Sequence, residues 1–306
     1  MKNIEDISKL KQFENLELIA KQVVEGFITG LHKSPFHGFS VEFAEHRLYN
    51  KGESVKNIDW KLYGKTDKLF VKRYDEETNL RCRIIIDVSS SMLFPYNEKN
   101  RQSKLLFSVY SAASLIHLLR KQRDAVGLTF LSEEIELHTQ AKMSSVHARM
   151  LYSKLNELVF NEKPLNKSSK QGELLHLISE KIHKRSLVII FSDMFSSENS
   201  EKLFSALQHL KHNKHEVILF HVTDKEHELE FKYNNRPYKF IDMETGETIK
   251  LNPNEIRDYY TKSSKSFFKK LKLKCGQYKI DFVEADVKSD FKEVLAPFLM
   301  KRSKMH

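Results

Sequence analysis

Short apolar runs alternate with amphipathic segments through most of the chain. The runs contain few polar residues, as strands buried on both faces do, and they occupy residues 83–88, 125–131, 187–193 and 216–222. The segments between and after them repeat apolar residues at helical spacing, over residues 103–121, 146–160, 173–184 and 198–212. This alternation predicts an α/β doubly wound, Rossmann-like fold, with a mainly parallel sheet covered by helices on both faces.

The flanking segments complete this expected sheet domain. Residues 134–138 follow a tight turn and suggest an antiparallel edge strand. The C-terminal elements are expected to be a helix over 256–272, a last strand over 278–284 and a last helix over 290–301. Between them, about residues 225–255 loosen into an aromatic stretch with a turn, which indicates a small hairpin insertion. We therefore expect one domain over residues 81–306.

The first 80 residues have a different character. Residues 6–31 carry apolar residues at helical spacing and predict one or two helices. Residues 32–80 are polar and aromatic and are interrupted by three glycines, with one short strand expected over 69–74. Residues 1–80 are thus predicted to form a helical and irregular lead-in that packs on the sheet domain.

Charge and cysteine content narrow the functional classes. The formal net charge is +10, but the lysines are spread along the chain among 41 acidic residues, without a run of five basic residues. This favours a solvated lysine-rich surface over a nucleic-acid patch. Cys82 and Cys275 have no metal-ligand or disulfide-framework spacing, as in a reducing compartment. Without a signal-peptide core or an apolar span of ~20 residues, the expected location is the cytoplasm.

Two of the predicted strands end on an aspartate and point the same way. Asp87 is followed by Ser89 and Ser91 at alternate positions, and Asp193 ends the run over 187–193. Ligands of open parallel sheets bind beyond the carboxyl ends of the strands. Carboxylates and hydroxyls are hard oxygen ligands that suit Mg²⁺. Either aspartate alone is better explained as a helix cap, but the pair with its two serines predicts a magnesium site.

The residues of this segment resemble the metal-ion-dependent adhesion site of von Willebrand factor A domains. The pattern is Asp-x-Ser-x-Ser-Met over residues 87–92, a helix, two strands and a later strand ending in Ser-Asp. The chain is still more similar to the bacterial domain-of-unknown-function family 58, which contains such a domain. The segments that carry this resemblance are residues 32–38 (HKSPFHG), 42–49 (EFAEHRLY), 52–53 (GE), 58–60 (IDW) and 240–247 (FIDMETGE).

The resemblance implies a fold of von Willebrand factor A type and a set of site residues. The implied metal ligands are Asp87, Ser89, Ser91 and Asp193. Sites of this type also take a Thr hydroxyl from the loop before the helix that leads into the last metal strand, but residues 166–173 (NKSSKQGE) contain no Thr. Ser168 or Ser169 could supply the hydroxyl, in a register that favours neither, and Ser169 is included as a weak ligand.

The implied partner contacts come from the lead-in and from the metal segment. They are Met92, Asp59, Trp60 and Arg47. Trp60 is the only Trp; on the residues alone it is more readily explained as an anchor of the lead-in on the sheet domain than as an interaction hot spot.

Three functions are compatible with these residues. The resemblance implies a non-enzymatic interaction module that acts with a MoxR-type AAA+ ATPase in protein maturation or remodelling, through an acidic residue of the partner. A Mg²⁺-dependent hydrolase, such as a phosphoesterase, is the alternative use of the same carboxylates, although no general base or second metal cluster is evident near the strand ends. Nucleic-acid binding through the basic surface ranks third.

Overall fold

The computed structural model describes residues 16–31, 46–49, 60–72, 80–95, 103–160, 170–195, 200–289 and 296–298. The chain divides into two compact units. The larger unit combines Met1–Phe27 with Leu80–His306, and the smaller one is Ile28–Asn79. Each unit is described by itself below.

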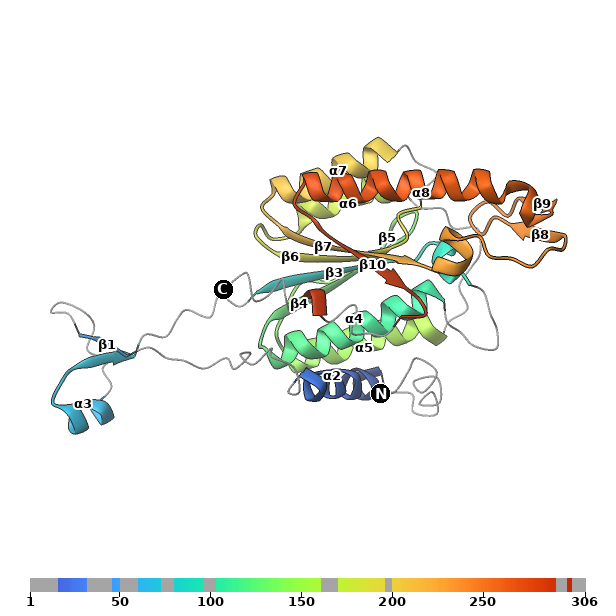
Figure 1. The fold of residues 1–306 in the computed structure, drawn as a ribbon. Helices are drawn as coiled ribbons and strands as arrows, with labels where there is room; N and C mark the ends of the chain where they lie inside the picture. The colour runs from blue at the N-terminus through green and yellow to red at the C-terminus, as the bar shows by residue number, and fades with distance from the viewer. Residues whose placement is uncertain are drawn as a thin grey trace. The chain divides into compact units, whose positions relative to one another are not determined.

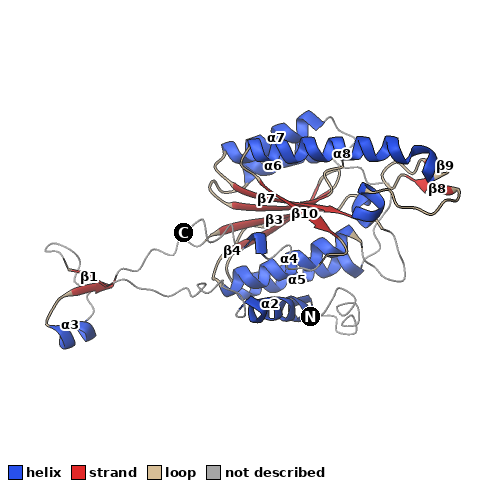
Figure 2. Ribbon diagram, in the orientation of Figure 1, coloured by secondary structure: helices blue, strands red, loops and turns tan. Residues whose placement is uncertain are grey.

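A six-stranded sheet forms the centre of the larger unit (Figures 1 and 2). The strands are β3 (Arg81–Asp87), β4 (Ala125–Leu131), β5 (Ile135–His138), β6 (Leu187–Ser192), β7 (Glu216–Thr223) and β10 (Asp281–Asp286). Their order is β10-β7-β6-β3-β4-β5, and all neighbours are parallel except β5, which pairs antiparallel with β4. The expected doubly wound fold and its antiparallel edge strand are confirmed.

Helices cover both faces of the sheet. They are α4 (Lys104–Lys121) and α5 (Ser145–Phe160) on one face, and α6 (Gln171–Lys181), α7 (Ser200–His212) and α8 (Pro253–Gln277) on the other. The described part of α2 (Leu16–Leu31) that belongs to this unit lies outside α4 and α5, where Glu17 pairs with Arg120 at 2.5 Å. In the part of the chain that the structure describes, no helix is both long and apolar enough to cross a bilayer.

The central strand shows why the sequence must form a two-sided core. Ile84, Ile85 and Ile86 of β3 are all fully buried. Successive strand residues point to opposite faces, and Ile85 belongs to the apolar cluster with Leu175, Leu207 and other residues of α6, α7 and α8. Ile84 and Ile86 consequently face the α4 and α5 layer, so a continuous apolar run is required.

The C-terminal helix α8 is longer than expected at both ends. It begins at Pro253, where the Asn252 side chain accepts a hydrogen bond from the N–H of Asn254 at 3.2 Å. It continues beyond residue 272 because Cys275 is buried against the core. Of the last helix expected over 290–301, only residues 296–298 are described, and these are helical.

Three described elements lie wholly within the smaller unit. Strands β1 (His46–Leu48) and β2 (Phe70–Lys72) pair antiparallel, and α3 (Trp60–Thr66) lies between them in the chain. The strand expected over 69–74 is present over Phe70–Lys72, and residues 73–74 lie outside the described part of the chain.

Gly127 of β4 marks a close approach in the sheet. A Cβ at this position would lie 2.7 Å from Nη1 of Arg83 and 2.9 Å from the backbone oxygen of Thr139. Arg83 is buried and donates through the same Nη1 to the carbonyls of Leu128 and Thr139, so it has little freedom to move away.

Gly127→Ala should therefore lower the free energy of unfolding by about 1–3 kcal/mol, measured by urea denaturation. Gly276→Ala is the matched control, because its added Cβ would have no atom within 4 Å beyond its chain neighbours and the adjacent backbone of its own helix. Within a helix, that exchange should stabilise by about 0.5–1 kcal/mol. If both variants changed the free energy of unfolding by the same amount, the close approach at Gly127 would be contradicted.

Candidate functional site

The two strands that carry the predicted aspartates lie side by side at the middle of the sheet. β3 and β6 pair in parallel with Ile86 opposite Phe191, so both strands end at the same edge. In the sheet, β4 is the neighbour of β3 on one side and β6 is its neighbour on the other. The helix between β3 and β4 covers one face of the sheet, and the helix that leads into β6 covers the opposite face. The edge between β3 and β6 is therefore the topological switch point, where doubly wound sheets bind ligands.

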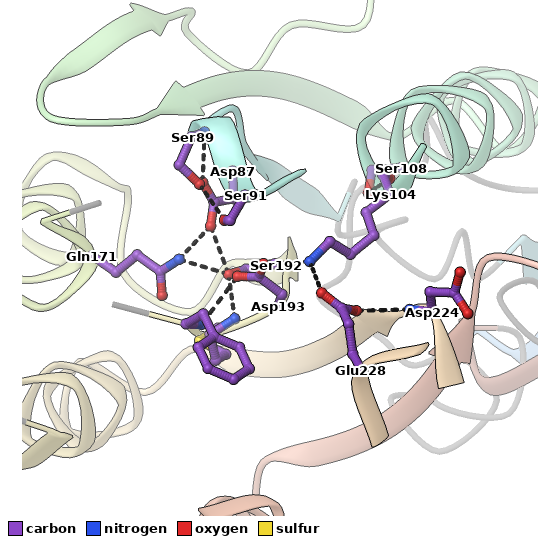
Figure 3. Close-up of polar contacts among 12 residues, drawn as sticks. Asp87, Ser89, Ser91, Lys104, Ser108, Gln171, Ser192, Asp193, Asp224 and Glu228 are labelled. Carbon is purple, nitrogen blue, oxygen red and sulfur yellow. Dashed lines mark hydrogen bonds and ion pairs between the residues drawn. The ribbon is translucent and has the colours of Figure 1, made fainter. Parts of the chain in front are cut away.

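The serines after β3 fold back onto Asp87 (Figure 3). Ser89 donates its N–H and its hydroxyl to Oδ1 of Asp87, at 3.0 and 2.6 Å, and Ser89 Oγ lies 3.1 Å from Ser91 Oγ. Asp87 does not cap α4, because that role belongs to Ser103, whose side chain accepts from the first turn of the helix. The sequence prediction that Asp87, Ser89 and Ser91 come together agrees with this geometry.

The other oxygen of Asp87 contacts β6 and the start of α6. Ser192 donates its hydroxyl to Oδ2 of Asp87 at 2.8 Å. Gln171, the first residue of α6, donates its amide to the same Oδ2 and to Ser192 Oγ, the latter at 2.8 Å. Gln171 comes from the loop where a Ser hydroxyl was expected; Ser169 itself lies outside the described residues. Sequence reasoning missed Gln171, which has no feature that distinguishes it from a surface glutamine.

Asp193 is bound by a lysine that sequence reasoning also missed. Its Oδ1 accepts from the N–H of Phe195 at 3.0 Å, and its Oδ2 accepts from Nζ of Lys104 at 2.7 Å. Lys104 is only 1% exposed and also pairs with Glu228 at 2.5 Å (Figure 3). Burial alone would lower the pKa of Lys104, but the carboxylates of Asp193 and Glu228 raise it above its ordinary value. The ammonium therefore stays charged.

Glu228 links this lysine to the segment that follows β7. It belongs to the π-helical turn η4 (Lys225–Leu229), and its Oε2 accepts from the N–H of Asp224 at 2.8 Å. Burial raises the pKa of Glu228 despite the attraction of Lys104. In turn, Asp224 Oδ2 lies 2.8 Å from Nδ1 of His227. The network extends the site across the carboxyl ends of β6 and β7.

Among the described residues, no positive side chain bonds to Asp87. Burial, and next the charge of Asp193, raise the pKa of Asp87 to about 6, although the hydrogen bonds from Ser89 and Ser192 act in the opposite direction. Lys104 compensates Asp193 and Glu228, but it makes no bond to Asp87 in the structure. A cation beside Asp87 would relieve this repulsion.

The donor set at the switch point fits a divalent cation. Two carboxylates and two serine hydroxyls lie together, and hard oxygen donors suit Mg²⁺. Oε1 of the buried Gln171 has no hydrogen-bond partner among the described residues, so an acceptor is available beside Asp87. In that same part of the chain, no three His, Cys, Asp or Glu side chains form a metal-binding group. A bound ion would depend on the serine hydroxyls and on water.

The residues predicted to contact a partner differ from one another in how far they are exposed. Met92 is fully buried, because the 3-10 turn η3 (Ser90–Leu93) directs its side chain into the core, so the expectation that it binds a partner does not fit. Trp60 is 62% exposed and makes an edge contact with Tyr63 at 6.2 Å between ring centroids. Arg47 lies in β1 opposite Val71. Asp59 is outside the described residues.

A doubly wound sheet with Asp-x-Ser-x-Ser after one central strand and Ser-Asp at the end of its neighbour defines a von Willebrand factor A-like protein. Residues 45–267 match the model of the family described as "Protein of unknown function DUF58". The chain belongs to that family.

Curated relatives and solved structures are similar to this chain at low identity. The uncharacterized proteins Rv1480 of Mycobacterium tuberculosis and Mb1516 of Mycobacterium bovis are each 21% identical over 225 residues, which cover 72% of this chain and 67% of theirs. Among solved structures, BatB from Bacteroides thetaiotaomicron has a TM-score of 0.45 and 15% identity over 74% of this chain and 99% of its own. The SpRpn10 VWA domain has a TM-score of 0.37 and 12% identity, covering 71% of this chain and 93% of its own.

Proposed function

We propose that this chain is a non-enzymatic protein-interaction module with a metal-ion-dependent adhesion-type site. Asp87, Ser89, Ser91 and Asp193 would hold Mg²⁺, and a carboxylate from a partner protein would complete its coordination. The observation that carries this proposal is the cluster of hydroxyls and carboxylates at the switch point between β3 and β6.

The charge distribution supports a ligand from outside. Asp193 is already neutralised by Lys104, so Asp87 is the carboxylate of this set that is left to balance a divalent ion. Serine hydroxyls are neutral and leave the ion electron-poor. An acidic side chain of a partner would therefore bind strongly in an open position.

The proposed partner is an AAA+ ATPase of the MoxR type, and the proposed task is maturation or remodelling of other proteins. This part rests on the resemblance to the family. The exposed Trp60 of the smaller unit and Arg47 are further candidates for partner contact.

Affinity capture from native lysate tests the proposal. Wild type should recover the ATPase in Mg²⁺ and lose it in chelator, whereas Asp87→Ala/Ser89→Ala should fail in both, since the ion and its bridge are removed. The ATPase is identified by mass spectrometry of the captured material.

Ser114→Ala is the matched control, because Ser114 is a buried serine of α4 whose hydroxyl donates to the Tyr110 carbonyl at 2.9 Å. It should capture as wild type does. Recovery of the ATPase that is equal in Mg²⁺, in chelator and with the double variant would rule out the metal-dependent interaction.

A further inference from the structure

Four turns at the edge of the sheet opposite the switch point share one backbone feature. They lead from α4 into β4, from α6 into β6, from α7 into β7 and from α8 into β10 (Figure 1). In each turn, the residue two positions before the strand has a positive φ and is an exposed lysine or arginine. These residues are Arg123 (58°), Arg185 (61°), Lys214 (62°) and Lys279 (56°).

Three of these turns close the preceding helix with the hydrogen bonds of a Schellman motif. After α7, the N–H of Lys214 donates to the Lys211 carbonyl at 2.9 Å, and the N–H of the next residue donates to the Leu210 carbonyl at 3.3 Å. The turns after α4 and α8 repeat this pattern, with Arg123 and Lys279 in the place of Lys214. Helices usually have glycine at this position, because glycine adopts a positive φ without a steric penalty.

The helix dipole does not account for cations at these strained positions. A positive charge near the C-terminus of a helix is stabilising, and a residue of the last helical turn supplies it at an unstrained negative φ. The three helices already have such residues there, namely Lys121, Lys211 and Lys274. The additional cations at positive φ therefore point to a use outside the fold.

Strand pairing brings these cations into one row. The strand order β10-β7-β6-β3-β4 places the four turns on one edge, together with the exposed Arg81 that begins β3. Neighbouring strands begin at most two residues apart in register. With about 4.8 Å between strands, the row is about 20 Å wide. We call it the basic edge, and it consists of Lys279, Lys214, Arg185, Arg81 and Arg123.

Basic residues outnumber acidic ones throughout the four turns. Of the acidic residues there, Asp124 is buried and accepts a backbone hydrogen bond at 3.1 Å, and Glu216 pairs with Lys211 at 3.3 Å. The surface of the basic edge is therefore positive. In all, nine Lys or Arg residues and four Asp or Glu residues lie in the turns, over residues 121–124, 180–186, 211–216 and 274–281.

Exposed apolar side chains lie beside this row of cations. The segment between β5 and α5 passes next to the start of β4, where Lys142 forms a β-bridge with Val126. In this segment, Met143 is 49% exposed and Val146 is 68% exposed. Peripheral proteins bind anionic bilayers through this combination, because the headgroups attract the cations and the apolar side chains enter the interface.

The turns lack the aromatic side chains by which proteins stack the bases of single-stranded nucleic acid. Among the described residues, the exposed aromatic side chains are Trp60, Tyr63, Phe195 and Tyr259, and none of them lies in these turns. The observations therefore favour a bilayer as the occupant of the basic edge.

We propose that the basic edge docks on an anionic phospholipid bilayer, with its cations on the headgroups and with Met143 and Val146 in the interface. The proposal does not depend on a metal ion at the switch point. Because the switch point lies at the other end of the same strands, docking turns that site away from the bilayer and toward partner proteins.

Sedimentation of the full chain with phospholipid vesicles tests the docking. Wild type should bind phosphatidylcholine vesicles that contain about 30% phosphatidylserine, bind pure phosphatidylcholine much more weakly, and lose affinity as salt rises. Arg123→Gly/Lys214→Gly/Lys279→Gly removes three charges where the backbone favours glycine, so the variant should remain folded and bind roughly a hundredfold more weakly. Met143→Ser/Val146→Ser should weaken binding roughly tenfold at every salt concentration.

The control removes three exposed lysines at the other end of the sheet. It is Lys225→Gln/Lys239→Gln/Lys250→Gln, in and before the hairpin of β8 (Tyr238–Ile241) and β9 (Thr248–Leu251), and it should bind as wild type does. An equal loss in the control, or equal binding of wild type to neutral and anionic vesicles, would overturn the proposal. So would tighter binding to duplex DNA than to the anionic vesicles that the glycine variant loses, because the basic edge would then be a nucleic-acid surface.

Discussion

Replacing Lys104 by methionine should lower the free energy of unfolding by about 3–5 kcal/mol. The ammonium is buried and binds Asp193 and Glu228 at 2.7 and 2.5 Å. Methionine fills much of the same volume but leaves two buried carboxylates without a counter-charge. Urea unfolding followed by circular dichroism at pH 7 measures the loss. The deficit should shrink toward acid pH, because burial raises the pKa of Glu228 and this carboxylate then takes up a proton.

Lys202→Met is the matched control for this experiment. Lys202 pairs with Glu173 at 2.8 Å, a distance similar to that of the buried pair, but both side chains are more than half exposed. Solvent screens such a pair, so its removal should not measurably change the urea concentration at which half of the protein is unfolded. If Lys104→Met and Lys202→Met unfold at the same urea concentration, the buried network around Asp193 contributes nothing to stability.

Asp87→Asn should abolish the response of the protein to Mg²⁺ without unfolding it. Wild type should gain thermal stability with rising Mg²⁺, because a ligand that binds only the folded state stabilises it. The variant should melt at one temperature at all Mg²⁺ concentrations. Its new amide can donate to Oε1 of Gln171 after that side chain reorients, so the hydrogen bonds around position 87 can be re-formed.

The same variant should change how stability depends on pH. The folded-state pKa of Asp87 is about 6, raised from 3.8. The folded protein therefore holds this proton more tightly than the unfolded chain, and the associated stability is complete below pH 3.8 and lost as pH rises through 6. In chelator, Asp87→Asn should avoid this loss and exceed wild type by up to about 3 kcal/mol at pH 7. A variant that is less stable than wild type in chelator at pH 7 would contradict the repulsion argument.

The sequence was sufficient to predict the buried strands and the part of the site that lies within one segment of the chain. Buried parallel strands read as apolar runs, and Asp87 with Ser89 and Ser91 lies within a single segment, so periodicity and spacing carry the information. Met92 belongs to the same segment, yet its direction depends on one 3-10 turn that spacing does not reveal, and the expectation of a partner contact did not fit.

The remaining residues of the site could not be predicted because long-range pairing creates their roles. Lysine is rarely buried, so the sequence gives no reason to place Lys104 beside Asp193. Gln171 and Glu228 are equally ordinary on helical segments.

The sequence separations within the site also determine when during folding it can exist. Gln171 reaches Asp87 across 84 residues, Lys104 reaches Asp193 across 89, and it reaches Glu228 across 124. Closing such long loops is slow, and contacts of this kind form only when the strands between them have paired. A nascent chain that has emerged only as far as β4 (Ala125–Leu131) holds Asp87, both serines and Lys104, but it lacks Gln171, Asp193 and Glu228. The site therefore requires β3, β6 and the segment after β7 together, and it belongs to the assembled sheet rather than to any one segment of the chain.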